Sequence, residues 1–113
     1  MGKLQRTKGA TYEREVAKLL TDALALKFER VLGQARDGGG DVQAEGSGLM
    51  VECKRRKTLK GLYAWMEQAR VSAFSELVPK IPVLAIRADS EETLIVIRAR
   101  DLIPFANEVL PDA

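Results

Sequence analysis

The chain has 113 residues, of which 46% are hydrophobic and 30% are charged. This length and mixture predict one folded domain, residues 1–113, with a single core, and they argue against disorder and against a second domain. The one cysteine, Cys53, excludes an internal disulfide, and the absence of histidine excludes a zinc site with the usual nitrogen and sulfur ligands. The net charge is only +2, so the positions of the charges are more informative than their sum.

No segment has the composition of a membrane span or of a secretion signal. The apolar runs fall short of the ~20 residues that a membrane helix needs. The first residues, Met1 to Arg6, lack the apolar stretch of a signal peptide. We therefore expect a soluble protein that is not secreted and acts inside the cell, in the cytoplasm or nucleoid, or in the host cytoplasm if the chain is viral.

The first half of the chain predicts one helix and three strands. Apolar residues at helical spacing predict a helix over residues 11–26. Residues 28–35 contain β-formers and lead into a glycine-rich loop at 37–40. Residues 41–45 and 49–54, separated by a Gly-Ser-Gly turn, predict an antiparallel hairpin.

The second predicted helix, residues 59–78, is apolar on two sides. One stripe contains Leu62, Trp65, Met66, Ala69, Ala73 and Leu77, and the other contains Tyr63, Val71, Phe74 and Val78. Two apolar faces imply two packing partners, one of which is the sheet. The other is a second copy in a homodimer, or another part of the chain if the helix is sandwiched within a monomer.

The last third of the chain predicts two strands and a helix. Residues 82–87 and 93–98 are apolar, β-branched strands joined by the acidic turn 89–92, and their near-continuous apolarity predicts that both faces are covered. Residues 99–110 predict a short helix interrupted around Pro104. The expected fold class is α/β, with a central mixed five-stranded sheet flanked by helices in the order α-β-β-β-α-β-β-α.

Two carboxylates and an amine fall within the predicted hairpin. Glu52 and Lys54 are two residues apart on one strand and so project from the same face. Asp41, at the start of the preceding strand, can lie opposite the end of that strand. Any metal must be oxygen-bound, and Asp41, Glu52 and the backbone carbonyl of Cys53 suffice for Mg²⁺, with Mn²⁺ as a substitute. Lys54 can position a water or offset negative charge, so the grouping favours metal-dependent phosphodiester cleavage.

Glu13 is a further candidate catalytic residue, which could reach the metal through a water. At 100° per residue it lies about 60° from Val16, toward the apolar side of the first helix. A carboxylate there is costly unless it is satisfied, and a metal-bound water or Lys54 could satisfy it. The simpler alternative is a first-turn glutamate that the helix dipole stabilises.

Basic residues gather at the start of the chain and directly after the hairpin. Such runs usually form a solvated face, but beside carboxylates that can hold a cation they can also bind phosphates. The candidate DNA-binding residues are Arg6, Lys8, Arg14, Arg36, Arg55, Arg56, Lys57 and Lys60. No base-reading element is visible, so we expect recognition of DNA shape more than of sequence.

The chain resembles the archaeal-type Holliday junction resolvases, a branch of the restriction-endonuclease-like PD-(D/E)XK nucleases. Residues 8–15, Lys-Gly-Ala-Thr-Tyr-Glu-Arg-Glu, resemble that family's opening Lys-Gly-x-x-x-Glu-Arg-Glu helix. Asp41 to Lys54 is similar to its Asp…Glu-x-Lys core, and residues 80–87 resemble the strand after its second long helix.

The resemblance implies the roles of four residues and an assembly. Asp41 and Glu52 would be metal ligands, Lys54 the catalytic lysine and Glu13 an accessory acid near the metal. The family acts as a homodimer in which each active site nicks one strand of a four-way DNA junction. Arg36 to Gly40 stands where the family often has a serine. Gln68 falls near where related nucleases can have a site-facing glutamine and is a weak candidate.

The leading hypothesis is a magnesium-dependent endonuclease that resolves four-way DNA junctions by paired nicks, in recombination and repair. A second is a PD-(D/E)XK nuclease that acts on other branched, nicked or linear DNA. A third is a non-catalytic DNA-binding module of the same fold, and a fourth is an α/β interaction protein that binds no nucleic acid.

Overall fold

The computed structural model describes residues 3–32 and 41–110, with the side chains of residues 3–8 outside the described part. The predicted glycine loop, the end of the first predicted strand and Arg36 therefore lie outside the described residues, as do the side chains of Arg6 and Lys8.

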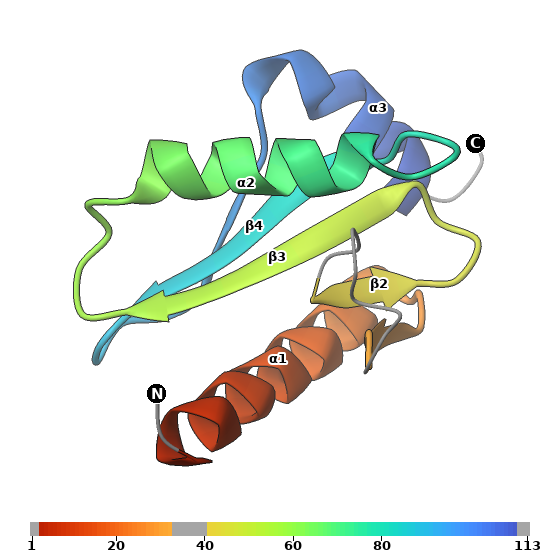
Figure 1. Cartoon of the computed structure of the whole chain (residues 1–113). Coiled ribbons are helices and arrows are strands. Elements are labelled where there is room, and N and C mark those ends of the chain that lie inside the picture. The colour runs from red at the N-terminus through yellow and green to blue at the C-terminus, as the bar shows by residue number, and fades with distance from the viewer. Residues whose placement is uncertain (1–2, 33–40, 111–113) are drawn as a thin grey trace.

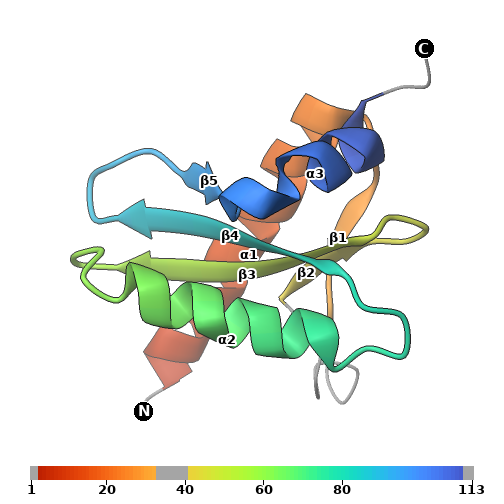
Figure 2. The ribbon, with the colours of Figure 1, turned by 90° about the horizontal axis from the view of Figure 1, so that it is seen from above.

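Five strands form one mixed sheet in the order β1-β2-β3-β4-β5 (Figure 2). The strands are β1 (Phe28–Arg30), β2 (Val42–Ala44), β3 (Leu49–Arg56), β4 (Ile81–Ala88) and β5 (Leu94–Val96). β3 and β4 are parallel, and the other neighbouring pairs are antiparallel. The helix between β3 and β4 explains the parallel pair, because such strands need a long crossover connection.

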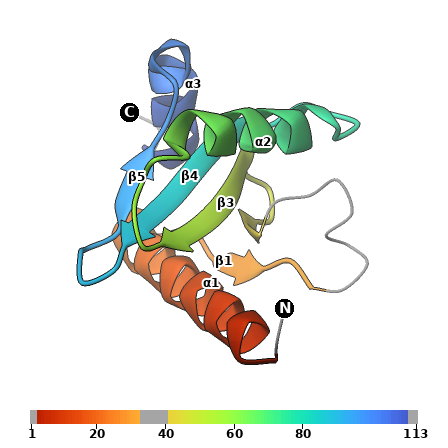
Figure 3. The same cartoon turned by 60° about the vertical axis from the view of Figure 1, so that its left-hand side comes forward.

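The two longer helices cover opposite sides of the sheet (Figures 1 and 3). They are α1 (Lys3–Leu24) and α2 (Leu62–Phe74), and the chain ends with a 3₁₀ turn, η2 (Ala99–Asp101), that leads into α3 (Leu102–Val109). None of these helices is both long and apolar enough to span a membrane, within the residues that the structure describes.

Each side of the sheet has its own apolar cluster, and the alternation of side chains along β3 and β4 divides residues between them. On the α1 side, Val51 of β3 and Ala85 of β4 pack with Val16 and Leu20, and α3 adds Phe105. On the α2 side the cluster contains Ala69, Leu84 and Ile86, with Leu59, Leu62, Trp65, Met66 and Val96 packed against it. Leu84 and Ile86 pair in register with Glu52 and Lys54.

The prediction that both apolar strands are covered on both faces is confirmed for β4 and wrong for β5. Val83 to Ile86 are at most 1% exposed. In β5, Leu94 is 49% exposed and Ile95 is 38% exposed. The difference follows from position, because β5 lies at the edge of the sheet and pairs only with β4.

Helix boundaries differ from the predicted ones at both ends of α1 and α2. α1 begins eight residues before the predicted Thr11, since apolar periodicity marks where a helix packs and not where it starts. It ends before Ala25, whose φ of 56° is left-handed. α2 ends at Phe74, where the hydroxyl of Ser75 donates to the carbonyl of Ser72 at 2.7 Å.

Pro104 does not interrupt the last helix, contrary to the prediction. It occupies the third position of α3. The first N–H groups of an α-helix have no acceptor within that helix, so a proline in the first turn removes nothing that the helix uses.

The element order α-β-β-β-α-β-β-α and the mixed five-stranded sheet with flanking helices confirm the predicted class. The architecture is the restriction-endonuclease-like α/β fold.

Candidate active site

The turn between β2 and β3 sets the register that places Asp41. Gly46 has a φ of 82°, which favours glycine, and the N–H of Ser47 donates to the carbonyl of Ala44 at 3.0 Å. β2 then runs antiparallel to β3 with Val42 opposite Val51. Asp41 therefore enters the sheet beside the middle of β3.

Asp41 is bonded to both neighbours of Glu52. Its backbone N–H donates to the carbonyl of Val51 at 2.9 Å. Its carboxylate oxygen Oδ2 accepts the backbone N–H of Cys53 at 2.8 Å. On its other side, the carbonyl of Asp41 accepts the N–H of Val31 at 3.0 Å. Three hydrogen bonds, two of them to β3, thus fix Asp41 alongside Glu52.

Glu52 and Lys54 share one face of β3, as the alternation of side chains requires. Both project to the side of the sheet on which Leu84 and Ile86 pack beneath α2. Glu52 is 6% exposed. Lys54, nearer the end of the strand, is half-buried. Glu52 and Lys54 therefore project from the same face of β3, and Asp41 lies next to Glu52.

Burial singles out the predicted acids. Among the described residues, the buried polar or charged side chains are Glu13, Asp41, Glu52 and Asp101. A buried carboxylate is costly unless other groups satisfy it, so each needs a physical reason. Asp101 has one, because Arg98 donates two hydrogen bonds to it at 2.8 and 3.2 Å. The other three are the acids that the sequence singled out.

Glu13 lies on the buried side of α1, as predicted, and one of its partners is a residue that was not predicted. Nε of Arg30 donates to Oε1 of Glu13 at 2.9 Å, and both side chains are largely buried. A metal-bound water and Lys54, the partners expected from the sequence, stay predictions. Strand alternation could have suggested Arg30, since it is two residues from the buried Phe28 and so projects from the same face of β1.

The ion pair of Glu13 joins α1 to the strand beside Asp41. Arg30 is paired in register with Val42, the residue after Asp41, and the backbone N–H of Val31 donates to the carbonyl of Asp41. Val42 packs in the cluster on the α1 side of the sheet, whereas Glu52 projects to the α2 side. Glu13 and Arg30 therefore lie on the α1 side of the sheet.

The donor set fits a hard divalent cation held by few protein ligands. Within the described part of the chain, no group of three or more Asp, Glu, Cys or His side chains is arranged to hold a metal. Mg²⁺ does not need such a cage, since one or two carboxylates with waters and substrate phosphate usually hold it. Asp41 and Glu52, with the backbone carbonyl of Cys53 next to Glu52 on β3, provide such a set.

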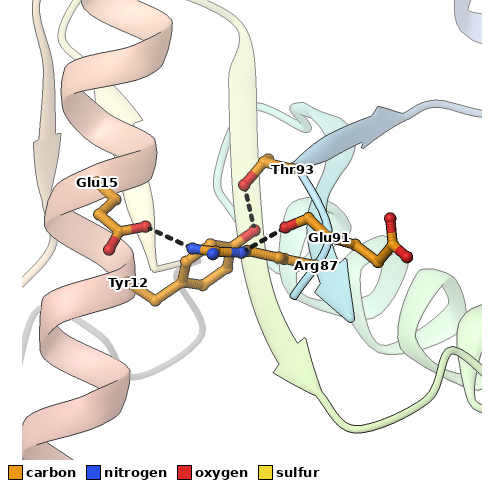
Figure 4. A network of polar contacts seen from close by, with 5 residues as sticks. All are labelled: Tyr12, Glu15, Arg87, Glu91 and Thr93. Atoms are coloured by element: carbon orange, nitrogen blue, oxygen red, sulfur yellow. Dashed lines mark hydrogen bonds and ion pairs between the residues drawn. The ribbon is translucent and has the colours of Figure 1, made fainter. Parts of the chain in front are cut away.

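A second polar network joins α1 to the turn after β4 (Figure 4). Arg87 donates to the carboxylate of Glu15 at 3.2 Å and to the carbonyl of Glu91 at 2.6 Å. The hydroxyl of Tyr12 lies 3.1 Å from that of Thr93. Burial raises the pKa of Tyr12, and the hydrogen bond with Thr93 partly offsets this. The network holds the turn of α1 that carries Glu13 against the sheet, and sequence alone gave no signal for it.

The candidate DNA-binding residues within the described part fall on two segments. Arg14 is exposed on α1, and Arg56, Lys57 and Lys60 are exposed at and after the end of β3. Arg55 is half-buried, with its Nε shielded and lacking a hydrogen-bond partner. Gln68 is exposed on α2.

The fold and the order of these residues define a class of protein. A restriction-endonuclease-like sheet with an aspartate before β2 and Glu-x-Lys on β3 is the arrangement of the PD-(D/E)XK nucleases. The chain belongs to the family described as "Phage putative PDDEXK endonuclease", which matches residues 4–110. Comparison with the curated proteins gives no match. The protein is thus a nuclease of the PD-(D/E)XK superfamily, whose members generally depend on a divalent metal.

Proposed function

We propose that the protein is a magnesium-dependent, structure-selective DNA endonuclease that resolves four-way junctions by paired nicks. The observation that carries the catalytic part is the bonding of Asp41 to Val51 and Cys53, on either side of Glu52. Two carboxylates in adjacent positions on a nuclease fold offer the oxygen ligands that Mg²⁺ prefers.

In this proposal, Asp41, Glu52 and the backbone carbonyl of Cys53 hold Mg²⁺, for which Mn²⁺ can substitute. The bound cation supplies Lewis-acid chemistry that activates water and neutralises charge on the phosphate. Lys54 projects from the same face of β3 as Glu52, so its ammonium group can orient the attacking water or offset charge that develops on the phosphate. Glu13 acts as an accessory acid whose position is fixed by Arg30.

The basic residues supply the surface for the DNA backbone. Phosphate contacts give most of the affinity for DNA and make it dependent on salt. Arg14 on α1 and the run Arg55 to Lys60 are the described candidates, and Arg6, Lys8 and Arg36 remain proposals from the sequence. We propose that α1 and the end of β3 contribute to one surface, because Arg87 of β4 pairs in register with Arg55 and contacts Glu15 of α1.

Paired nicks require two active sites, and the outer side of α2 fits a second copy. Val71 is 54% exposed and Val78 is 75% exposed. Leu77, which was predicted to lie in the stripe that contains Trp65, follows the end of the helix and is 100% exposed. Phe74 is in cation–π contact with Arg70 and Arg98, whose guanidinium carbons are 5.6 and 5.5 Å from the ring centre. Contiguous apolar residues of this kind commonly mark an interface between proteins.

One competition experiment tests the choice of substrate. A labelled four-way junction and a linear duplex of the same sequence are incubated together with the protein and Mg²⁺. Symmetrical nicks in the junction, with the duplex intact, support the proposal. Equal cleavage of both substrates would favour the alternative of a nuclease for linear, nicked or other branched DNA. Binding without cleavage of either would favour a non-catalytic DNA-binding module.

Sedimentation tests the dimer. Val71→Glu places a charge on the outer side of α2 while removing no buried contact. We expect the wild-type chain to sediment as a dimer and the variant as a monomer. Leu110→Glu, at an exposed position at the end of α3, is the control and should leave the dimer intact. A wild-type monomer at all concentrations would contradict the dimer.

A further inference from the structure

The first turn of α2 presents an aromatic side chain that the proposed catalysis does not use. Tyr63 is 89% exposed. Tyrosine is enriched at binding interfaces, because its ring is apolar and its hydroxyl can remain in water. Tyr63 is eleven residues before Phe74, which separates the two by about 16 Å along the helix. It therefore lies at the other end of α2 from the apolar residues assigned above to the dimer.

The surroundings of Tyr63 are basic. Arg56, at the end of β3, and Lys57 and Lys60, in the connection to α2, are all exposed. They lie within seven residues of Tyr63 in the chain, and no acidic residue occurs between Lys54 and Tyr63. Glu67, one turn further along α2, is ion-paired with Arg70. The three cations before Tyr63 therefore give this end of α2 a charge complementary to the phosphates of DNA.

The Trp65 ring connects Arg56 to the start of α2. The guanidinium carbon of Arg56 is 5.8 Å from the centre of the Trp65 ring, within the range of a cation–π contact. The ring also lies so close to Gly61 that a Cβ added there would be 2.7 Å from two atoms of the ring. The tryptophan also packs against the cluster beneath α2. Arg56 and the first turn of the helix are therefore joined through one half-buried ring.

The position of Tyr63 relative to the acids limits which part of a DNA substrate it can meet. Glu52 and Arg56 are four residues apart on β3, or about 13 Å. Successive nucleotides of one strand are spaced by roughly 3.4 Å along the helix axis. Arg56, at the end of β3, therefore lies about four nucleotides from a phosphate held at the acids, and Tyr63 follows Arg56 by seven residues in the chain. Tyr63 is suited to contact bases beside the cleaved bond and not the cleaved phosphate itself.

We propose that Tyr63 stacks on an unpaired base of the DNA substrate, about four nucleotides from the scissile phosphate. An aromatic ring stacks well only on a base whose face is open, and in a continuous duplex the neighbouring base pairs cover that face. Stacking of this kind is tolerant of sequence and acts together with cations that follow the backbone. The inference rests on the proposed function, in that the chain must bind DNA. It assigns to Tyr63 the preference for DNA with an opened or branched segment.

Fluorescence of a base analogue tests the stacking directly. The DNA is a duplex with a single-stranded arm that carries 2-aminopurine at its first unpaired position, and a chelator prevents cleavage. Stacking on an aromatic ring quenches 2-aminopurine. We expect the wild-type protein to quench it in the arm and not in a fully paired duplex of the same sequence. Tyr63→Ala should abolish quenching and weaken binding of the armed DNA about tenfold, with duplex binding unchanged.

Two matched variants separate stacking from other effects. Tyr63→Phe keeps the ring and loses the hydroxyl, so it should behave as the wild-type protein does. Leu110→Ala removes an exposed apolar side chain at the end of α3 and should change nothing. Equal quenching and affinity for wild type and Tyr63→Ala would overturn the proposal, as would a lack of quenching by the wild type. The DNA with the single-stranded arm contains no four-way junction. The stacking test therefore gives an answer even if the protein does not cleave junctions.

Discussion

The carboxylate of Asp41 accepts a hydrogen bond from the backbone N–H of Cys53 at 2.8 Å, which fastens this buried acid to the residue that follows Glu52. The bond gives Asp41 a structural part as well as its proposed part in binding metal. The structural role needs only a hydrogen-bond acceptor, which the neutral amide oxygen of an asparagine also provides. The metal-binding role needs a charged carboxylate, because the amide oxygen is a poorer ligand for Mg²⁺.

Substitutions at Asp41 should therefore separate stability from activity. Asp41→Asn keeps an acceptor for Cys53 and should fold normally, while DNA cleavage falls by about 100-fold or more because a charged metal ligand is lost. Asp41→Ala also leaves a buried N–H without its acceptor and should be roughly 1–3 kcal/mol less stable than Asp41→Asn. Urea unfolding and a cleavage assay measure the two effects. Full activity in the Asn variant would contradict the assignment of Asp41.

The ion pair between Glu13 and Arg30 should stabilise the fold measurably. Arg30→Met removes the donor from a buried carboxylate and should cost about 2 kcal/mol, as expected for a hydrogen bond to a charged group. In Glu13→Gln/Arg30→Met the buried charge is gone as well, so the double variant should lose less than the sum of the single changes. A double-mutant cycle in urea gives the coupling. Additive losses would show that the two side chains do not act as a pair.

Tyr12 should make stability fall at high pH. Burial raises the pKa of its hydroxyl above the ordinary value of 10.0 in the folded state, so the folded protein holds this proton more tightly than the unfolded chain does. The stabilisation is fully present below pH 10 and declines as the pH rises past that value toward the folded pKa. Tyr12→Phe should show a shallower loss of stability above pH 10 than the wild type. Identical slopes for the two proteins would mean that Tyr12 titrates as it does in the unfolded chain.

Gly61 and Gly9 should respond to alanine in opposite ways. At Gly61 an added Cβ would lie 2.7 Å from the Trp65 ring, so Gly61→Ala must displace the ring and should cost roughly 1–3 kcal/mol. At Gly9, within α1, nothing lies within 4 Å, and Gly9→Ala should stabilise the protein by about 0.5–1 kcal/mol. Trp65 is the one tryptophan, so its fluorescence reports the displacement. An unshifted spectrum and unchanged stability in Gly61→Ala would show that the ring does not depend on this contact.

Local pattern was enough to predict the element order, the hairpin and the burial of Glu13. In each case the information lies within a few residues, as in the glycine turn before β3 or the apolar stripe of α1. The fully buried β4 could be predicted for the same reason, since its apolar run has no polar interruption between Pro82 and Ile86.

What the sequence could not supply depends on contacts between distant segments. β5 is as apolar as β4, and its exposure follows only from its place at the edge of the sheet. Arg30 meets Glu13 across 17 positions of the chain, and Arg87 meets Glu15 across 72. No periodicity links such pairs, because tertiary packing brings them together.

The central claim is that Asp41 and Glu52 jointly hold a divalent cation, and calorimetric titration with Mg²⁺ or Mn²⁺ tests it most directly. The wild-type protein should take up the cation, and Asp41→Asn and Glu52→Gln should each weaken this uptake at least about tenfold. Glu45→Gln, which removes an exposed acid at the turn after β2, serves as the charge control and should bind as the wild type does. Uptake that is unchanged in both Asp41→Asn and Glu52→Gln would contradict the claim.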